Sequence, residues 1–270
     1  MDHLSDFHRL ERREFKYLIP EATAQKLRRA IRPYCVPDAH VADKPSRSYS
    51  IESLYFDARD LRLFHENEHA SFDRIKLRAR TYPEAGSNKV YLEVKRRSGD
   101  VVEKTRGVVD EAIALELLDR SRVPSRAAEE AIRRDPGVER FFTLFSIHCA
   151  EPVAIVRYDR EPYVSMVDDY ARITFDRNIV ARDAQSIDFL RADQGAGEFR
   201  PLDHAEHSWG AGSMVLLELK FTQDVPIWMV DLVQNLELLR GSFSKYGRAV
   251  RATRGLPQER AARLGGLWTH

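Results

Sequence analysis

The sequence has few of the features that mark secreted or membrane-embedded proteins. It contains only two cysteines, Cys35 and Cys149, without a CxxC pair, so neither a disulfide framework nor a zinc ribbon is predicted. Apolar runs are much shorter than the roughly 20 residues that a membrane-spanning helix needs. The charged start MDHLSDFHRLERRE lacks the apolar segment of a signal peptide. We therefore expect a cytoplasmic protein without direct membrane insertion.

A large net charge is also missing. The 270 residues include 43 Lys and Arg and 42 Asp and Glu, a formal net charge of +1. A polybasic protein binds nucleic acid or anionic membranes through its bulk charge, so the balance predicts no nucleic-acid partner. Any basic site must be assembled locally by the fold. The length predicts one domain over residues 1–270, with a loose tail over about 255–270.

Alternating polar and apolar residues predict about eight β-strands dispersed along the chain. The predicted strands are 11–19, 47–57, 74–80, 90–97, 101–109, 152–165, 171–179 and 214–221. Helical spacing is found over 20–31, 60–69, 110–148 and 226–240, and the polar stretch 182–213 is predicted to be loop. Hairpin-like spacing between strands predicts an α+β protein with an antiparallel sheet, either open or closed into a barrel.

The segment RIKLRARTY, residues 74–82, shows an unusually regular alternation. Ile75, Leu77 and Ala79 would form one apolar face of a strand. Residues two apart on a strand lie about 7 Å from each other on the same face. The opposite face therefore aligns four cations, Arg74, Lys76, Arg78 and Arg80.

Basic residues also dominate the polar faces of the other predicted strands. A solvated sheet face would carry mixed signs and more uncharged polar residues, and this alternative stays open for any single strand. Like charges on neighbouring strands repel each other unless an anion neutralises them. The whole set therefore predicts a phosphate-binding surface, to which the strands contribute Lys16, Lys95, Lys104, Arg106, Arg160, Arg172 and Lys220.

Three glutamates, Glu14, Glu93 and Glu218, each lie two positions before a lysine on these polar faces. Among phosphates, a carboxylate is useful for holding a divalent cation that bridges phosphate oxygens. They are predicted metal ligands for this reason. Pairing of each glutamate with its neighbouring lysine is the alternative, and both roles can hold at once.

Nine short motifs follow one another in a characteristic order. They are RREFKY, SLYFD, RIKLRARTY, LEVKRR, EKTRG, RYDREPY, RITFD, LLELKF and FSKYGR. Through them, residues 10 to about 250 resemble the polyphosphate polymerase (vacuolar transporter chaperone, VTC) domain of the triphosphate tunnel metalloenzyme superfamily. The resemblance implies a closed antiparallel eight-stranded β-barrel that forms a tunnel, with helices packed outside.

The resemblance also implies an activity. The VTC domain transfers the γ-phosphoryl group of ATP onto a growing inorganic polyphosphate chain, with Mn²⁺ or Mg²⁺ as cofactor. A triphosphate or polyphosphate hydrolase on the same scaffold and a non-catalytic polyphosphate-binding module are the alternatives. Any membrane partner would be a separate chain.

Site roles follow from the matching motifs. The resemblance places Lys16, Arg78, Arg80, Lys95, Arg160, Arg172 and Lys245 along the phosphate path, joined by Lys104 and Arg106. Arg160, Arg172, Lys95 and Lys245 are the implied catalytic cations, and Glu218 is the implied metal ligand. Many relatives in the superfamily begin with an ExExK motif, whereas here Arg12 precedes Glu14 and Lys16. This loss of one carboxylate favours the polymerase over the hydrolase.

The segment HENEH, residues 65–69, matches the HExxH pattern of zinc proteases. Glu68 places a charge inside the motif, and the sequence offers no convincing third ligand. The segment is therefore predicted to be a solvated helix.

Overall fold

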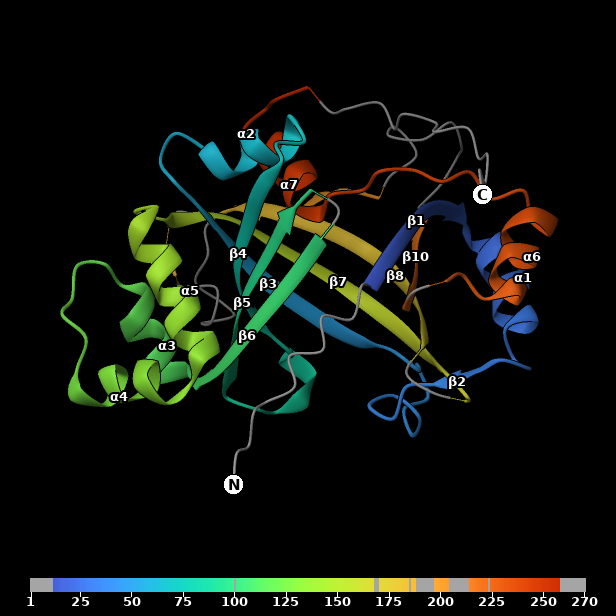
Figure 1. Cartoon of the computed structure of the whole chain (residues 1–270), viewed down its shortest axis with the longest axis horizontal. Coiled ribbons are helices and arrows are strands. Elements are labelled where there is room, and N and C mark those ends of the chain that lie inside the picture. The colour runs from blue at the N-terminus through green and yellow to red at the C-terminus, as the bar shows by residue number, and fades with distance from the viewer. Residues whose placement is uncertain are drawn as a thin grey trace.

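In a computed structural model, the described residues include ten β-strands that form the framework of the protein (Figure 1). The structure describes residues 12–99, 101–167, 170–184, 186–187, 197–203, 214–222 and 224–257. The strands are β1 (Arg12–Pro20), β2 (Cys35–Pro37), β3 (Tyr49–Asp57), β4 (Asp73–Thr81), β5 (Lys89–Ser98), β6 (Val101–Asp110), β7 (Glu151–Ser165), β8 (Ala171–Asp183), β9 (Arg200–Pro201) and β10 (Met214–Thr222).

Helices connect and cover these strands. They are α1 (Glu21–Ala30), α2 (Arg62–Glu68), the 3₁₀ helix η1 (Pro83–Ala85), α3 (Glu111–Leu118), α4 (Arg126–Arg134), α5 (Pro136–Ile147), α6 (Ile227–Asn235) and α7 (Lys245–Thr253). Across the described ranges, no helix combines the length and the apolar character needed to cross a membrane.

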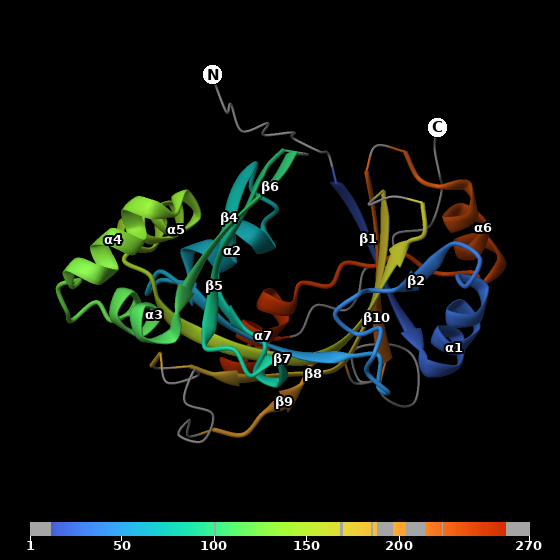
Figure 2. The same cartoon turned by 90° about the horizontal axis from the view of Figure 1, so that it is seen from below.

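All strand pairs are antiparallel, and the sheet is open. The order is β1-β10-β8-β7-β3-β4-β5-β6, with β2 beside β7 and β9 beside β8. Within the described residues β1 and β6 end this order and do not pair with each other. The predicted closed eight-stranded barrel is therefore wrong. The sheet instead curves into a trough, with β4, β5 and β6 in one wall, β1 and β10 in the other, and β7 and β8 between them (Figure 2).

The outer edge of β1 is occupied by a segment other than β6. The Gly241 N–H donates to the carbonyl of Lys16 at 2.9 Å, and Arg240 forms an isolated bridge with Tyr17. The chain that follows α6 thus uses the hydrogen-bonding groups with which a closing strand would pair. This contact gives a physical reason why the sheet stays open at β1.

The convex face of the sheet is apolar and carries most of the helices. As the alternation of residues 74–80 predicted, Ile75, Leu77 and Ala79 are buried there, in a cluster with Phe141 and Phe145 of α5. A second cluster joins α1 and α6 to the outer faces of β1, β8 and β10. Burial of these apolar faces leaves the charged side chains of the same strands facing the trough.

One end of the concave face is covered by α7 and α2. Tyr246 and Val250 of α7 pack with Phe64 of α2 against an apolar part of the inner face that includes Tyr55 and Leu216. Figure 2 shows α7 lying between the two walls. This helix places its first residue, Lys245, inside the trough.

Several predicted boundaries need correction or lie outside the described residues. Helix α6 ends at Asn235 rather than near residue 240, because Glu237 takes a left-handed backbone conformation with φ 47°. The predicted loop 182–213 and the predicted loose tail 255–270 lie largely outside the described ranges. The side chain of Arg12 is likewise not described.

Candidate functional site

A cavity of about 1110 Å³ lies in the trough and is lined from both walls. It brings together predicted phosphate-binding and catalytic cations that are far apart in the sequence. They are Lys16, Lys76, Arg78, Arg80, Lys95, Lys104, Arg106, Arg160, Arg172, Lys220 and Lys245. Glu14 and Glu218, two of the predicted metal ligands, line the same cavity. The curvature of the sheet thus converts separate basic strand faces into one charged enclosure.

Two predicted site residues lie outside this lining. Arg74 donates from Nη1 to the backbone oxygen of Ser71 at 2.5 Å, near the turn that precedes β4. Glu93 is only 1% exposed. It lies beneath the cations rather than in the cavity.

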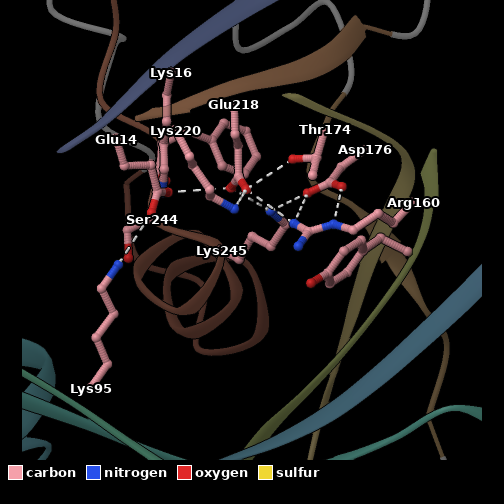
Figure 3. Close-up of polar contacts among 12 residues, drawn as sticks. Glu14, Lys16, Lys95, Arg160, Thr174, Asp176, Glu218, Lys220, Ser244 and Lys245 are labelled. Atoms are coloured by element: carbon pink, nitrogen blue, oxygen red, sulfur yellow. Dashed lines mark hydrogen bonds and ion pairs between the residues drawn. The ribbon is translucent and has the colours of Figure 1, made fainter. Parts of the chain in front are cut away.

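Glu218 accepts hydrogen bonds from several directions at the centre of the site (Figure 3). Its Oε2 accepts from Arg160 at 3.0 Å, from Thr174 at 3.2 Å and from Lys220 at 2.7 Å. Its Oε1 accepts from Lys245 at 3.2 Å. Burial alone would raise the pKa of Glu218, but the lysines and Arg160 hold it well below its usual range. Glu218 is therefore a carboxylate throughout the neutral pH range.

Asp176 lies beside Glu218 and is fully buried. Arg160 donates from Nε and Nη2 to its two carboxylate oxygens, each at 2.7 Å, and Lys245 donates to it at 2.6 Å. These two carboxylates raise the pKa of Lys245 despite its burial. The result is a compact group of two anions and two cations at the floor of the trough.

A second acidic position joins the two walls. Glu14 of β1 lies 3.1 Å from Lys16 on its own strand and 3.5 Å from Lys95 of β5 in the opposite wall. Lys16 Nζ also lies 3.8 Å from Glu218 Oε1. The pKa of Glu14 is lowered, because the surrounding lysines outweigh the effect of its burial. An ion pair, rather than strand pairing, thus connects the walls at this point.

Glu93 is surrounded by cations of β4 and β6. The shortest distances from its carboxylate oxygens are 2.6 Å to Arg78, 2.7 Å to Lys104 and 2.6 Å to Arg106. Burial would raise its pKa, but these cations keep it below the usual range. We infer that Glu93 supplies the counter-charge that allows the three cations to lie together.

Lys76 of β4 donates from Nζ to the uncharged hydroxyl of Ser244 at 3.2 Å. Burial and, to a smaller extent, the nearby cations Lys16, Lys95, Arg74 and Arg78 together lower its pKa to about 7. This side chain is therefore poised to gain a proton when an anion enters the cavity.

Several polar and aromatic residues of the site were not among the predicted site residues. Asp176 shares a strand face with Arg172 and Thr174. Its position at the end of the RITFD motif, on the same face as Arg172, could have identified it as a site residue. Tyr55 accepts a hydrogen bond from Arg78 at 3.1 Å. The ring of Tyr158 lies 4.6 Å from Lys245 Nζ. No local sequence pattern could place the Tyr55 ring opposite Arg78 of the paired strand β4 or the Tyr158 ring against Lys245 of α7.

The donor set fits a divalent cation only in part. Among the described residues, no group of three or more His, Cys, Asp or Glu side chains is arranged to hold a metal. Glu218 and Asp176 do offer hard oxygen ligands, and both contact Lys245, so a positive charge is already favoured between them. Mg²⁺ is commonly held by one or two carboxylates together with substrate phosphates. The residues therefore suit a metal that shares its coordination with phosphate oxygens.

The HENEH segment forms the second half of α2 together with its C-cap His69, and it does not form a zinc site. His65 and His69 are exposed, with ring centroids 6.1 Å apart. Glu68 accepts from Nε of Arg251 in α7 at 2.8 Å. Its role in the described structure is to join α2 to α7.

Comparison with known families identifies the chain. A sequence profile of the VTC domain matches residues 11–254. The chain belongs to the VTC domain family. This match covers the trough and α7, and it confirms the resemblance drawn from the ordered motifs. No protein of curated function matches this VTC domain.

Several solved structures resemble this VTC domain at low sequence identity. A putative adenylyl cyclase from Hippeastrum, described as having a dominant triphosphatase activity, is 17% identical, with a TM-score of 0.48 over 91% of this chain and 96% of that one. A putative adenylate cyclase from Bacillus halodurans is 11% identical, with a TM-score of 0.44 over 86% and 92%. A Mimivirus capping enzyme triphosphatase is 9% identical, with a TM-score of 0.31 over 86% and 91%.

Proposed function

We propose that this VTC domain is a metal-dependent polyphosphate polymerase that transfers the γ-phosphoryl group of ATP onto a polyphosphate chain. The observation that carries the proposal is the cavity between the walls, which is lined by cations from β1, β4, β5, β6, β7, β8, β10 and α7. Such a lining matches a linear polyanion better than a single small anion, because charge is distributed along the whole enclosure. Membership of the VTC domain family supports the same substrate class.

The proposed reaction needs positioning and charge neutralisation more than a general base. A terminal oxygen of the polyphosphate chain is already an anion, and it forms a bond to the γ-phosphorus of ATP. The bond between that phosphorus and the β–γ bridging oxygen breaks, and ADP leaves with the electron pair. Phosphoryl transfer thus balances without proton transfer to a side chain.

The cations near Glu218 would stabilise charge on the transferred group. Arg160 and Lys245 lie at the buried acidic pair, while Arg172 lines the cavity on the same strand as Asp176. Preorganised cations of this kind act strongly because they need no reorganisation during the reaction. Lys16 and Lys95 would hold the neighbouring phosphates from opposite walls.

Glu218 and Asp176 would hold Mn²⁺ or Mg²⁺ together with phosphate oxygens. A divalent cation bound there would neutralise charge on the β- and γ-phosphates. We assign the metal to this pair rather than to Glu93, because Glu218 lines the cavity whereas the buried Glu93 carboxylate lies beneath it.

The test is incubation of the purified protein with ATP and Mn²⁺ or Mg²⁺, followed by separation of the products on a polyphosphate gel. Long chains together with released ADP are expected. Free phosphate without chains would instead indicate the hydrolase. Absence of turnover with retained polyphosphate binding would indicate a binding module.

Glu218→Gln supplies the matching variant. It is expected to remove metal-dependent turnover while polyphosphate binding persists, because the basic walls remain intact. Glu129→Gln is the control, since Glu129 is exposed on α4 and lies 3.7 Å from Arg133, outside the cavity. Thermal unfolding of both variants separates loss of chemistry from loss of fold. An equal loss of binding and turnover in Glu218→Gln would contradict the metal role.

A further inference from the structure

One part of the cavity wall differs chemically from the rest. Tyr49 at the start of β3 and Tyr82 just after β4 line it, together with Pro162 and Val164 of β7. Asp38 lines the cavity in the same region, where its backbone N–H donates to the Pro162 carbonyl at 3.0 Å. Aromatic, apolar and acidic groups thus lie beside the cations Arg160 and Arg172 in this part of the lining.

The tyrosines are arranged as a connected group of rings. The ring centroids of Tyr49 and Tyr82 lie 5.7 Å apart at an interplanar angle of 65°. Tyr82 lies 5.2 Å from Tyr91 at 84°, and the guanidinium of Arg106 lies 4.9 Å from the Tyr91 ring. Edge-to-face contacts of this kind fix the rings in place. The group therefore forms a defined wall that adjoins the basic side of the cavity.

Strand register places these rings next to the phosphate-binding cations. Tyr49 is paired with Arg160 between β3 and β7. Tyr91 is paired with Arg80 between β4 and β5. The backbones of Tyr49 and Arg160 therefore lie one strand spacing apart, about 5 Å. Both residues line the same cavity, so a ligand whose phosphates bind at Arg160 has the aromatic wall beside it.

The ring faces and apolar side chains of this wall do not favour a phosphate chain. Inorganic polyphosphate presents only charged phosphoryl groups, which could use the tyrosine hydroxyls but gain nothing from the ring faces and are repelled by the Asp38 carboxylate. Burial raises the pKa of Tyr49 to about 12, so its ring is uncharged at neutral pH. A nucleobase, in contrast, has a planar face that stacks on aromatic rings and N–H groups that a carboxylate accepts.

We propose that Tyr49 and Tyr82 form a nucleobase subsite, with Asp38 as a hydrogen-bond acceptor at its edge. This inference rests on the proposed function, because it takes ATP as the phosphoryl donor. It specifies how ATP lies in the cavity. The base lies against the tyrosines, and the triphosphate extends past Arg160 toward Lys245 and Glu218.

The test compares two ligands that carry three phosphates each and differ in the nucleoside. Affinities for ATP and for inorganic tripolyphosphate are measured by titration calorimetry on the full chain and on Tyr82→Leu. Tyr82 is the better first target, because it follows the end of β4 and is only partly buried. Tyr82→Leu is expected to weaken ATP binding about tenfold, equivalent to about 1.4 kcal/mol, and to change tripolyphosphate binding less than twofold.

Three further variants sharpen the result. Tyr82→Phe keeps the ring and is expected to retain ATP affinity, while Tyr49→Leu is expected to repeat the selective loss. Tyr34→Leu is the control, since Tyr34 is exposed and stacks on Trp228 outside the cavity. It should leave both affinities unchanged.

Two results would overturn the inference. Equal weakening of both ligands by Tyr82→Leu and Tyr49→Leu would mean that the rings only shape the cavity. Unchanged ATP affinity in both variants would mean that the base lies elsewhere. In both cases the proposed polymerase could still stand, whereas failure of the unmodified chain to bind either ligand would overturn the proposed function itself.

Discussion

Arg160 binds Asp176 through two parallel hydrogen bonds of 2.7 Å each, and its Nη2 also reaches Glu218 at 3.0 Å. One guanidinium thus fixes both buried carboxylates of the site. Only an arginine offers this planar, two-pronged geometry, because the lysine ammonium is a single point of charge.

Arg160→Lys is therefore expected to lower turnover about a hundredfold, since the carboxylates lose their fixed orientation while the positive charge remains. The measurement is ADP release at saturating ATP. Arg157→Lys is the matched control, because Arg157 lies on the same strand and pairs with Glu52 away from the cavity. Similar losses in the two variants would contradict a role specific to Arg160.

Lys76 is expected to make polyanion binding depend on pH. Its pKa of about 7 in the folded protein lies below its ordinary value of about 10.4. A bound polyanion favours the ammonium form, so binding takes up a proton and weakens as pH rises through 7. Comparison with Lys76→Met isolates this effect from titration of the phosphates. The affinity ratio of unmodified protein to variant should fall about tenfold between pH 6 and 8.

The same lowered pKa predicts how stability changes with pH. Between about pH 7 and 10 the unfolded chain binds more protons at Lys76 than the folded chain does, so the contribution of this group to stability rises with pH. Urea unfolding of Lys76→Met should lack this increment. Lys89→Met is the control, because Lys89 is exposed and pairs with Asp110. A pH dependence that is the same in all three proteins would contradict the prediction.

Glu93→Gln tests whether this residue is a counter-charge or a metal ligand. Removing the buried carboxylate leaves Arg78, Lys104 and Arg106 without their shared partner, and the free energy of unfolding should fall by about 3 kcal/mol. Added tripolyphosphate should raise the melting temperature of the variant more than that of the unmodified protein, since the ligand supplies the missing negative charge. Loss of metal-dependent turnover without loss of stability would support the metal role instead.

Asp57 anchors the helix that presents Lys245. It accepts from the backbone N–H groups of Ala58, Leu63 and Phe64 at 2.7–2.8 Å, and from the hydroxyl of Tyr246. Asp57→Ala would leave several buried donors unpaired and should lower the free energy of unfolding by about 3 kcal/mol.

Tyr246→Phe removes one of these hydrogen bonds and should cost about 1 kcal/mol. It should also reduce turnover, because α7 then holds Lys245 less firmly. Tyr170→Phe is the control, since the Tyr170 hydroxyl donates to the backbone oxygen of Asp224, away from α7 and outside the cavity lining. Equal turnover in both tyrosine variants would contradict this positioning role.

Most long strands could be predicted from sequence because one face of each packs in the apolar core and the other faces the charged trough, which produces an alternating pattern. Strand β4 was expected over residues 74–80 and extends over Asp73–Thr81. The short strands β2 and β9 were missed, because two or three residues are too few to show alternation. Helix α7 was also missed, since GSFSKYGR gives no clear apolar stripe and the helix is stabilised by packing against distant strands.

The sequence by itself determined which side chains share a strand face, because successive residues on a strand must point in opposite directions. It thereby selected nearly all the cations of the cavity and the family to which the chain belongs. Only the tertiary structure decided that the sheet is open, because closure depends on which segment pairs with the edge of β1. It also decided the different partners of Glu218 and Glu93, since these depend on contacts between strands that no local pattern records.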